Sequence, residues 1–378
     1  MYDGALNRAN PYGDDKVIAA CSIFGMIDTS GKRVGGEGVI RAIANMHDRS
    51  NGLGGGFAVY GLYPEFSEQY ALHVMYGNRA DQGDIEDFLH DHFDVLMEED
   101  IPTRRKARVT KPPLLRRYFV EVGDRTLADQ TEDDYVVQRV MEINAGPRDA
   151  CVFSSGRDMG TFKGLGYPED VADYFRLDEY RGYLWTAHGR FPTNSQAWWG
   201  GAHPFSLLDL TVVHNGEISS YGTNRRFLEM YGYQCSMHTD TEVIAYALDL
   251  LLRRHSLPIE LAAKVLACPL WSDIDRLEPK ERALYTALRQ TYGSLLMNGP
   301  FTIIVARSGE MIGLTDRIRL RPLTAAVKGD VFYLSSEESA IRLISPDAER
   351  TWIPVGGQPL VARIRAGERA EMEEELVA

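Results

Sequence analysis

The chain has 378 residues, of which 44% are hydrophobic and 25% are charged, so it is long and apolar enough to bury the core of one large domain or two modest ones. Its formal net charge of −13 argues against a general nucleic-acid surface, because phosphate binding needs clustered lysine and arginine. We interpret the basic stretch 104–117 as a solvated loop or a rim that faces a partner. No apolar run approaches the roughly 18 residues that a membrane helix requires. The composition therefore predicts a soluble globular protein with neither nucleic-acid nor membrane partners.

The N-terminal segment 1–20 is a polar leader with three acidic residues and no apolar core, unlike a secretory signal. The four cysteines of the chain are widely spaced and form no C-x-x-C motif, which disfavours a disulfide framework or an iron–sulfur site in this chain. We therefore expect a cytoplasmic protein in which residues 1–20 are a leader or propeptide.

The first core block contains a strand-like run at 21–28, a helix over 36–47 and a strand around 56–60. A glycine cluster at 51–56 lies between the helix and the second strand. A dinucleotide-binding fingerprint requires the opposite order, with a strand before the glycines and a helix after them. We therefore interpret the cluster as backbone that closes tightly near an active site.

The middle of the chain, from about 67 to 146, changes to a pattern of alternating strands and helices. The expected elements are a strand over 70–76, a helix over 83–96, a strand over 114–122 and a helix over 133–143. This order indicates an inserted α+β unit of the split β-α-β kind. The core then resumes with residues 151–153 and with the strand 183–187.

The second half of the chain contains a helix over 241–254, and helical periodicity predicts a second insertion over 257–298. A core strand follows at 301–306. The core ends near residue 365, and residues 366–378 form a charged tail. Periodicity alone predicts only a mixed α and β fold.

Cys21 is the first candidate for chemistry. If the chain is cut between Ala20 and Cys21, one residue gains a nucleophilic thiol and an α-amine together. An α-amine has an unperturbed pKa of about 8, so it takes a thiol proton at neutral pH without a separate histidine. The alternative is a buried apolar cysteine at the start of a strand.

Three downstream segments, 187–193, 212–218 and 238–242, place many polar groups beside apolar strands. In the second segment, Asn215 and Gly216 form a pair that accepts turn geometry with positive φ, which would leave the Gly216 N–H pointing at a ligand. An ordinary hairpin is the alternative.

The third segment begins a helix. Thr239 and Glu242 have the spacing of a capping box, and an apolar run follows them. Asp240 then stands in the first helical turn, where the helix dipole favours an anion. A purely structural Asp240 is therefore the alternative to a substrate-binding one.

Together with Cys21 and the segment 202–205, these three segments resemble the class II glutamine amidotransferases, whose N-terminal cysteine removes ammonia from glutamine. The resemblance extends to about residue 364 and implies the four-layer αββα sandwich of the N-terminal-nucleophile hydrolases, with the two insertions described above. Two features depart from the family pattern. Ser22 stands where glycine usually follows the nucleophile, and a leader must be removed where many relatives lose only methionine.

The resemblance also implies roles for individual residues. A guanidinium suits the α-carboxylate of glutamine, a carboxylate suits its α-ammonium group, and fixed donors suit the oxyanion formed during attack. The residues concerned are Cys21, Asn215 and Gly216 for catalysis and Arg190, Thr193 and Asp240 for substrate binding.

Within the class, the segments 268–277 and 296–301 look like those of the stand-alone amidotransferase subunit of archaeal-type glutamate synthases. That likeness implies a hetero-oligomer in which ammonia passes to a separate FMN-dependent synthase chain that also holds an iron–sulfur cluster. We expect no cofactor in this chain, because it contains no FMN-binding motif.

Three alternatives remain open. An N-terminal-nucleophile hydrolase for another amide would share Cys21 without needing Arg190 and Asp240. A non-catalytic scaffold subunit would keep the leader, which blocks the α-amine. A metal site, which we do not expect because the spacings fit no zinc pattern, would use His188, His203, His214, His238 and Cys235.

Overall fold

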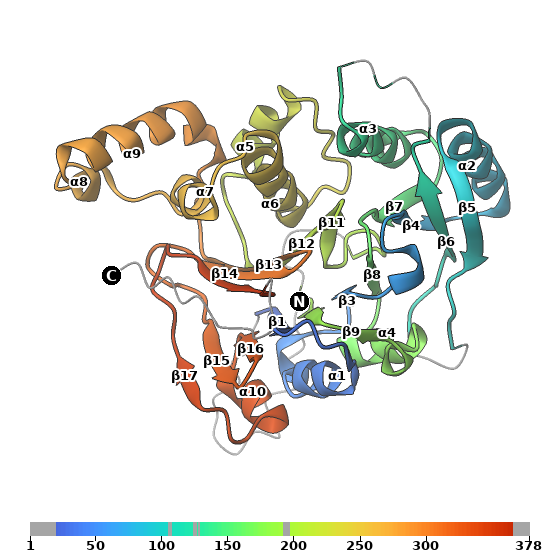
Figure 1. Cartoon of the computed structure of the whole chain (residues 1–378), viewed down its shortest axis with the longest axis horizontal. Helices are drawn as coiled ribbons and strands as arrows, with labels where there is room; N and C mark the ends of the chain where they lie inside the picture. The colour runs from blue at the N-terminus through green and yellow to red at the C-terminus, as the bar shows by residue number, and fades with distance from the viewer. Residues whose placement is uncertain (1–19, 105–107, 124–126, 128, 192–196, 366–378) are drawn as a thin grey trace, which may run out of the picture.

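Two antiparallel sheets packed face to face form the centre of the molecule (Figure 1). The computed structural model describes residues 20–104, 108–123, 127, 129–191 and 197–365. The first sheet has seven strands in the order β17 (Arg350–Trp352), β15 (Thr324–Lys328), β16 (Val331–Ser335), β1 (Ser22–Asp28), β10 (Leu184–Gly189), β3 (Gly55–Tyr60) and β8 (Met159–Gly164). The second sheet has five strands in the order β11 (Phe205–Leu207), β12 (Leu210–Gly216), β13 (Phe301–Arg307), β14 (Glu310–Thr315) and β18 (Leu360–Arg363).

Helices cover the outer sides of both sheets. On the first sheet these helices are α1 (Glu37–Ala44), α4 (Pro168–Tyr174) and α10 (Glu338–Ile344). On the second sheet, α6 (Asp240–Asp249) packs against β11 and β12, and α5 (Tyr221–Glu229) packs against α6. The layers therefore run helix, sheet, sheet, helix, and this order confirms the αββα fold that the resemblance implied.

Strand β1 shows why the central strands lack an alternating pattern in the sequence. Successive side chains of a strand point to opposite faces, and both faces of β1 are covered. Ile23 and Ile27 lie in an apolar cluster with Ile304 of the second sheet, whereas Phe24 lies in the cluster that contains Ile43 of α1. A strand buried on both faces therefore appears in the sequence as a continuous apolar run.

A third sheet lies beside the sandwich, at the right of Figure 1. Its strands pair antiparallel in the order β5 (Asp94–Asp100), β6 (Leu114–Glu121), β4 (Tyr70–Tyr76) and β7 (Ala150–Ser154). Helix α2 (Arg79–His92) joins β4 to β5, and α3 (Glu132–Ala145) joins β6 to β7. This is the split β-α-β arrangement that the alternating pattern indicated.

Two details of this unit correct the sequence prediction. The helix expected over 83–96 ends at His92, because Phe93 is buried in an extended conformation and the edge strand β5 follows. The charged, mostly exposed side chains of β5 hide its strand character. Residues 151–153 belong to β7 of the third sheet and not to the central core. Asn144 anchors this strand by two hydrogen bonds with the backbone of Val152, at 2.7 and 3.0 Å.

The basic stretch 104–117 is not a single solvated loop. Arg104 is half-buried and pairs with Asp178 over 2.7 Å. Arg117 is buried within β6 and forms an ion pair with Glu99 of the neighbouring strand. Both guanidinium groups are neutralised within the chain, which makes them poorly suited to binding phosphate.

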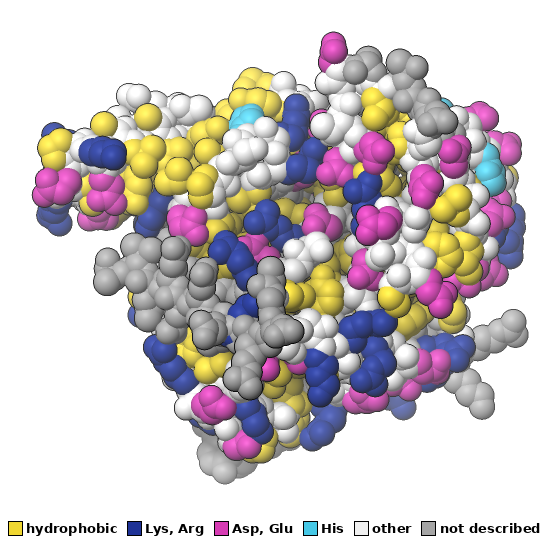
Figure 2. Space-filling model, in the orientation of Figure 1, with side chains coloured by type: hydrophobic (Ala, Val, Ile, Leu, Met, Phe, Trp, Pro, Cys, Tyr) yellow, Lys and Arg dark blue, Asp and Glu magenta, His cyan; other side chains and the backbone are white. Residues whose placement is uncertain are grey.

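The second insertion is helical, as its periodicity predicted. It contains α7 (Ile259–Leu266), α8 (Trp271–Ile274) and α9 (Pro279–Tyr292). Hydrophobic side chains gather along this insertion at the left of Figure 2, and Trp271 is 46% exposed. Over the described part of the chain, no helix has the length and apolar character needed to cross a membrane.

The two sheets bring distant segments to one edge of the sandwich. β1 and β10 pair so that Ser22 lies opposite Gly189, which places the residue before β1 near the residue after β10. In the second sheet, β12 ends at Gly216. Two residues later, the backbone N–H of Ile218 donates a hydrogen bond to the carboxylate of Asp240, in the first turn of α6. The ends of β1, β10, β12 and the start of α6 thus surround a common site.

Candidate active site

Cys21 lies directly before β1 and contacts the chain that leaves β10. The backbone N–H of Phe191 donates to Cys21 Sγ over 3.3 Å. Burial raises the pKa of the Cys21 thiol, while the Phe191 N–H and Arg190 act to lower it and Asp240 acts to raise it. The thiol is therefore protonated at neutral pH, and a nearby base is required to form the nucleophilic thiolate.

Arg190 follows directly after β10 and is 3% exposed. Its backbone N–H donates to Gly54 O over 2.8 Å, and its carbonyl accepts from Ser50 Oγ over 3.0 Å. Gly54 has φ of +146°, and a Cβ at this position would lie 3.0 Å from Arg190 Cδ. The glycine cluster therefore closes tightly against Arg190, one of the predicted site residues.

Asn215 and Gly216 do not form the turn expected from their sequence. They are the last two residues of β12 and pair with Thr302 and Phe301 of β13. The next residue, Glu217, donates its N–H to Pro300 O over 3.0 Å. Because ladder bonds alternate along antiparallel strands, the Gly216 N–H points away from β13, on the side of β12 that β11 no longer covers. The predicted donor is thus presented by a strand end and not by a hairpin turn.

The side chain of Asn215 is fully buried beside β1. Its Nδ2 lies 3.5 Å from Ser336 Oγ, which accepts a hydrogen bond of 3.1 Å from the N–H of Ile23. Among the described residues, Asn215 Oδ1 has no hydrogen-bond partner. The long contact of Nδ2 leaves this amide suited to donate to a developing oxyanion.

Asp240 is the first residue of α6, and its carboxylate faces the end of β12. Oδ2 accepts a hydrogen bond of 3.2 Å from Ile218 N–H, and Oδ1 lies 3.6 Å from His214 Nδ1. Burial acts to raise the pKa of Asp240, but the effects of His214, Ile218 and Thr241 are together larger and lower it. Asp240 is therefore an ionised carboxylate in a largely buried position.

Three buried histidines support this side of the site. His188 Nε2 donates to His214 O over 3.0 Å, and the His188 ring stacks on the His203 ring at 4.0 Å. Burial lowers the pKa of His188 to about 3, so its imidazole is neutral. His203 Nε2 and His214 Nδ1 both contact Thr241 Oγ1, the neighbour of Asp240. The histidines thus form a hydrogen-bonded support behind Asp240.

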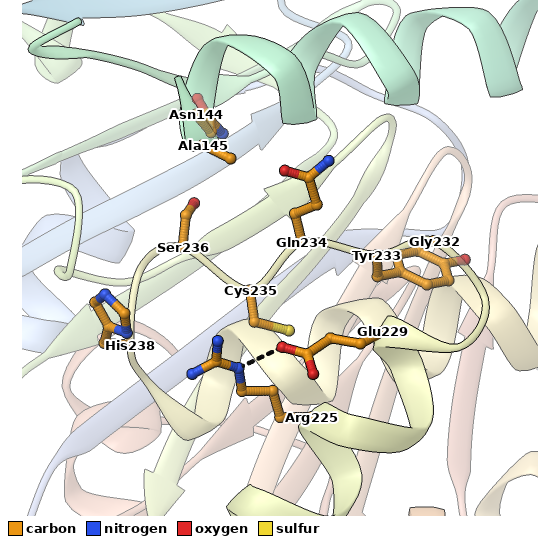
Figure 3. A pocket seen from close by; sticks show the side chains of 10 residues that line it. All are labelled: Asn144, Ala145, Arg225, Glu229, Gly232, Tyr233, Gln234, Cys235, Ser236 and His238. Atoms are coloured by element: carbon orange, nitrogen blue, oxygen red, sulfur yellow. Dashed lines mark hydrogen bonds and ion pairs between the residues drawn. The ribbon is translucent and has the colours of Figure 1, made fainter. Parts of the chain in front are cut away.

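Cys235 and His238, the other residues considered for a metal site, lie on the loop before α6. They line a cavity of about 710 Å³ between α3 and α5 (Figure 3). Within the described ranges, no group of three or more histidine, cysteine, aspartate or glutamate residues is arranged to hold a metal ion.

The described structure thus brings five predicted residues to one edge of the sandwich, and Thr193 lies outside the described residues. The five are Cys21, Arg190, Asn215, Gly216 and Asp240. The sequence assigned no role to Ser336, which contacts Asn215, or to Arg321, whose charge acts on the Cys21 thiol. Both lie in C-terminal segments, 316–323 and 332–339, that also resemble the family, but the resemblance alone does not tell which of their side chains reach Asn215 or Cys21.

The chain is similar in sequence to several known proteins. A sequence-family model described as "Glutamine amidotransferases class-II" matches residues 90–352. An "Uncharacterized protein" of Archaeoglobus fulgidus is 56% identical over 362 residues, which cover 94% of this chain and 95% of that protein. A "Putative glutamine amidotransferase" of Methanothermobacter thermautotrophicus is 29% identical over 213 residues, covering 55% of this chain and 60% of that protein.

A longer enzyme also matches. The glutamine–fructose-6-phosphate aminotransferase of Vibrio vulnificus is 31% identical over 163 residues, which cover 43% of this chain and 24% of that enzyme. The chain thus spans about a quarter of the length of this relative. The family match begins at residue 90, so the assignment of Cys21 depends on the geometry described above.

Proposed function

Because the chain belongs to the class II glutamine amidotransferases, we propose that it hydrolyses glutamine to glutamate and ammonia through a thioester on Cys21. The observation that supports this most directly is that Cys21 Sγ accepts a hydrogen bond of 3.3 Å from the Phe191 N–H, directly after Arg190, in a place where the charges of Arg190 and Asp240 both act on the thiol. A cation and an anion beside one nucleophile suit a substrate that carries an α-carboxylate and an α-ammonium group.

The first step is removal of the leader, since the Cys21 nitrogen is otherwise an amide bonded to Ala20. Cys21 Sγ attacks the Ala20 carbonyl carbon, the C–N bond breaks, and the acyl group moves to sulfur. Water then hydrolyses the thioester. The products are a leader that ends in a carboxylate and a chain that begins with the α-amine and thiol of Cys21.

Glutamine then binds with its α-carboxylate at Arg190 and Thr193 and its α-ammonium group at Asp240. The α-amine of Cys21 accepts the thiol proton, and sulfur attacks the amide carbon of glutamine. Asn215 Nδ2 and the Gly216 N–H stabilise the oxyanion; loss of one such donor typically costs about 10²- to 10³-fold in rate.

Collapse of the tetrahedral intermediate releases ammonia. The proton held by the α-amine moves to the leaving nitrogen as the C–N bond breaks, and a thioester with Cys21 remains. Water attacks this thioester, the α-amine accepts a proton from the water, and glutamate leaves as the thiol reforms. Atoms and charges balance over the cycle without any cofactor.

We further propose that the ammonia passes to a partner synthase of the FMN-dependent, iron–sulfur type, as the likeness to archaeal-type glutamate synthase subunits suggests. The exposed side chains of Leu270, Trp271 and Leu284 on the helical insertion support a protein partner, because exposed apolar groups that cluster commonly mark interfaces. Both cofactors would belong to the partner.

Ammonia and glutamate release from glutamine, together with intact mass, tests the proposal. We expect active wild-type protein to lack residues 1–20, and Cys21→Ala to keep them and to lose at least about 100-fold in rate. Full glutaminase activity in Cys21→Ala, or an active wild-type protein that retains its leader, would contradict the mechanism.

The same assays separate the remaining alternatives. A scaffold subunit would keep the leader and release no ammonia. A hydrolase for another amide would be processed at Cys21 but would prefer substrates without the α-carboxylate and α-ammonium groups of glutamine.

A further inference from the structure

Glu242 is a buried carboxylate that the mechanism above does not use. It lies in the first turn of α6 and is 0% exposed. Its Oε1 accepts hydrogen bonds from the backbone N–H groups of Ser236 (2.9 Å) and Met237 (3.1 Å), and its Oε2 accepts a second bond from Met237 (3.0 Å). These charge-assisted bonds tie the loop before α6 to the helix itself.

The capping box expected at Thr239 and Glu242 is only half formed. Thr239 Oγ1 accepts from Glu242 N–H over 3.2 Å, but the Glu242 carboxylate reaches past Thr239 to Ser236 and Met237. Between these two anchors, His238 has φ of +56°, a left-handed conformation that residues other than glycine seldom adopt. Such a conformation persists only where the surroundings hold it.

The outer side of this loop is hollow. Figure 3 shows Cys235, Ser236 and His238 along one wall of the 710 Å³ cavity, with Asn144 and Ala145 of α3 on the opposite wall. Packing from that side therefore does not fix the loop. The loop is held from the inside, by the hydrogen bonds that Glu242 makes and by the burial of Cys235 and Met237 in the core.

Asp240 stands between the loop and Glu242 in the chain. Its carboxylate must face Ile218, at the end of β12, while Glu242 faces the loop behind it. We propose that Glu242 is a positioning residue for glutamine binding, whose carboxylate fixes residues 236–239 so that Asp240 meets the α-ammonium group. This inference rests on the proposed glutaminase function.

The charge of Glu242 is set by its buried surroundings. Burial raises the pKa of Glu242 to about 7, opposed by the bonds from Met237 and Ser236, by Tyr246 and by the charge of Lys163. Burial likewise lowers the pKa of Lys163 to about 8. The titratable groups that act on or respond to Glu242 are Lys163 on β8, Cys151 on β7, Tyr246 on α6, Tyr221 on α5 and Cys235 on the loop.

The ionised form of Glu242 is the better acceptor for the loop N–H groups, so protonation loosens the loop. Glutamine binding should therefore weaken as the pH falls through about 7. Lys163 remains cationic over this fall in pH, because its pKa lies higher.

The variant Glu242→Gln, with glutamine as the probe, tests the positioning role. We expect KM for glutamine at pH 8 to rise about tenfold and kcat to change less than about threefold. Glu229→Gln is the matched control, because it removes a carboxylate from the same cavity that is bonded to Arg225 over 2.8 Å and does not touch the loop. Both constants should keep their wild-type values in the control.

The pH profile of KM provides a second readout. Wild-type KM should rise about tenfold from pH 8 to pH 6, and KM of Glu242→Gln should stay flat over this range. An unchanged KM in Glu242→Gln, a loss confined to kcat, or a wild-type KM independent of pH would overturn the inference. If Glu242→Gln does not fold, a wild-type KM that stays constant from pH 8 to pH 6 still overturns the inference. Full activity in Cys21→Ala would instead refute the proposed function.

Discussion

The backbone N–H of Ile218 donates to Asp240 Oδ2 over 3.2 Å, and this bond joins the end of β12 to the start of α6. Gly216 is the last residue of β12, only two positions before Ile218. The short segment 216–218 therefore holds two groups at a fixed separation. They are the Asp240 carboxylate, proposed to bind the α-ammonium group, and the Gly216 N–H, proposed to stabilise the oxyanion. A small amino acid that contacts both is bound in a defined orientation.

Asp240→Asn should weaken glutamine binding without unfolding the protein. The asparagine keeps an oxygen that accepts from Ile218 but loses the negative charge that pairs with the α-ammonium group. Because hydrogen bonds to charged groups contribute about 1.5–3 kcal/mol, we expect kcat/KM to fall by about 10- to 100-fold, mainly through KM. Steady-state kinetics with glutamine checks this, with thermal unfolding as the control for the fold. A wild-type KM in this variant would show that Asp240 is only structural.

Much of the fold could be predicted because its central strands are buried on both faces and its helices have clear limits. The prediction failed where local pattern and tertiary role differ. β5 is a charged edge strand whose composition resembles an exposed helix, so the preceding helix was extended into it. Residues 151–153 form an apolar strand, but nothing in their own sequence tells which of two sheets they join.

For the site, the sequence predicted the chemical groups but not their geometry. Its chemical groups could be named from short segments, since a cysteine, a guanidinium and a carboxylate have distinct chemistry. The geometry of Asn215 and Gly216 could not be predicted from the sequence. An Asn-Gly pair locally favours a turn, whereas pairing with β13 keeps both residues in a strand. Contacts such as that from Asn215 to Ser336 join residues 121 positions apart and leave no local signal.

Gly216→Ala should strongly reduce activity and destabilise the protein. Gly216 has φ of +151°, and a Cβ there would lie 2.1 Å from Pro300 O. The strand must shift to accept the methyl group, which displaces the proposed oxyanion donor. We expect kcat to fall at least about 100-fold and the free energy of unfolding to fall by about 1–3 kcal/mol.

Gly38→Ala is the matched control for this prediction. Gly38 lies within α1, and apart from its chain neighbours and the backbone of its own helix no atom lies within 4 Å of a Cβ at this position. The same substitution should therefore leave activity unchanged and stabilise the helix by up to about 1 kcal/mol. A Gly216→Ala protein as active as this control would exclude Gly216 from the oxyanion site.

Cys21 should react slowly with iodoacetamide at neutral pH and faster as the pH rises. Burial raises the pKa of its thiol, so the thiolate fraction is small near pH 7 and grows with pH. Peptide mass spectrometry of protein labelled at several pH values measures this rate. Burial raises the pKa values of Cys151 and Cys235 to about 12, and these two residues serve as internal controls that should stay unlabelled. Rapid labelling of Cys21 that does not depend on pH would contradict this expectation.

Lys163 and Glu242 should together produce a minimum in stability between about pH 7 and pH 8. The pKa of Glu242 is raised from 4.5 to about 7, so between these values the folded state binds more protons and the free energy of unfolding falls as the pH rises. The pKa of Lys163 is lowered from 10.5 to about 8, so between these values the folded state binds fewer protons and stability increases with pH. Each group contributes up to about 3 kcal/mol to the profile.

The double variant Glu242→Gln with Lys163→Met removes both groups, so its free energy of unfolding should vary less with pH than that of the wild type, on both sides of this minimum. Urea unfolding at intervals from pH 5 to pH 10 measures the difference between the two profiles. Lys328 and Asp347 form an exposed ion pair, and removing their charges by Lys328→Met with Asp347→Asn should leave the wild-type profile in place. If the double variant at Glu242 and Lys163 keeps the full wild-type profile, then other groups cause the minimum, because a buried pair with these pKa values cannot be removed without flattening both slopes.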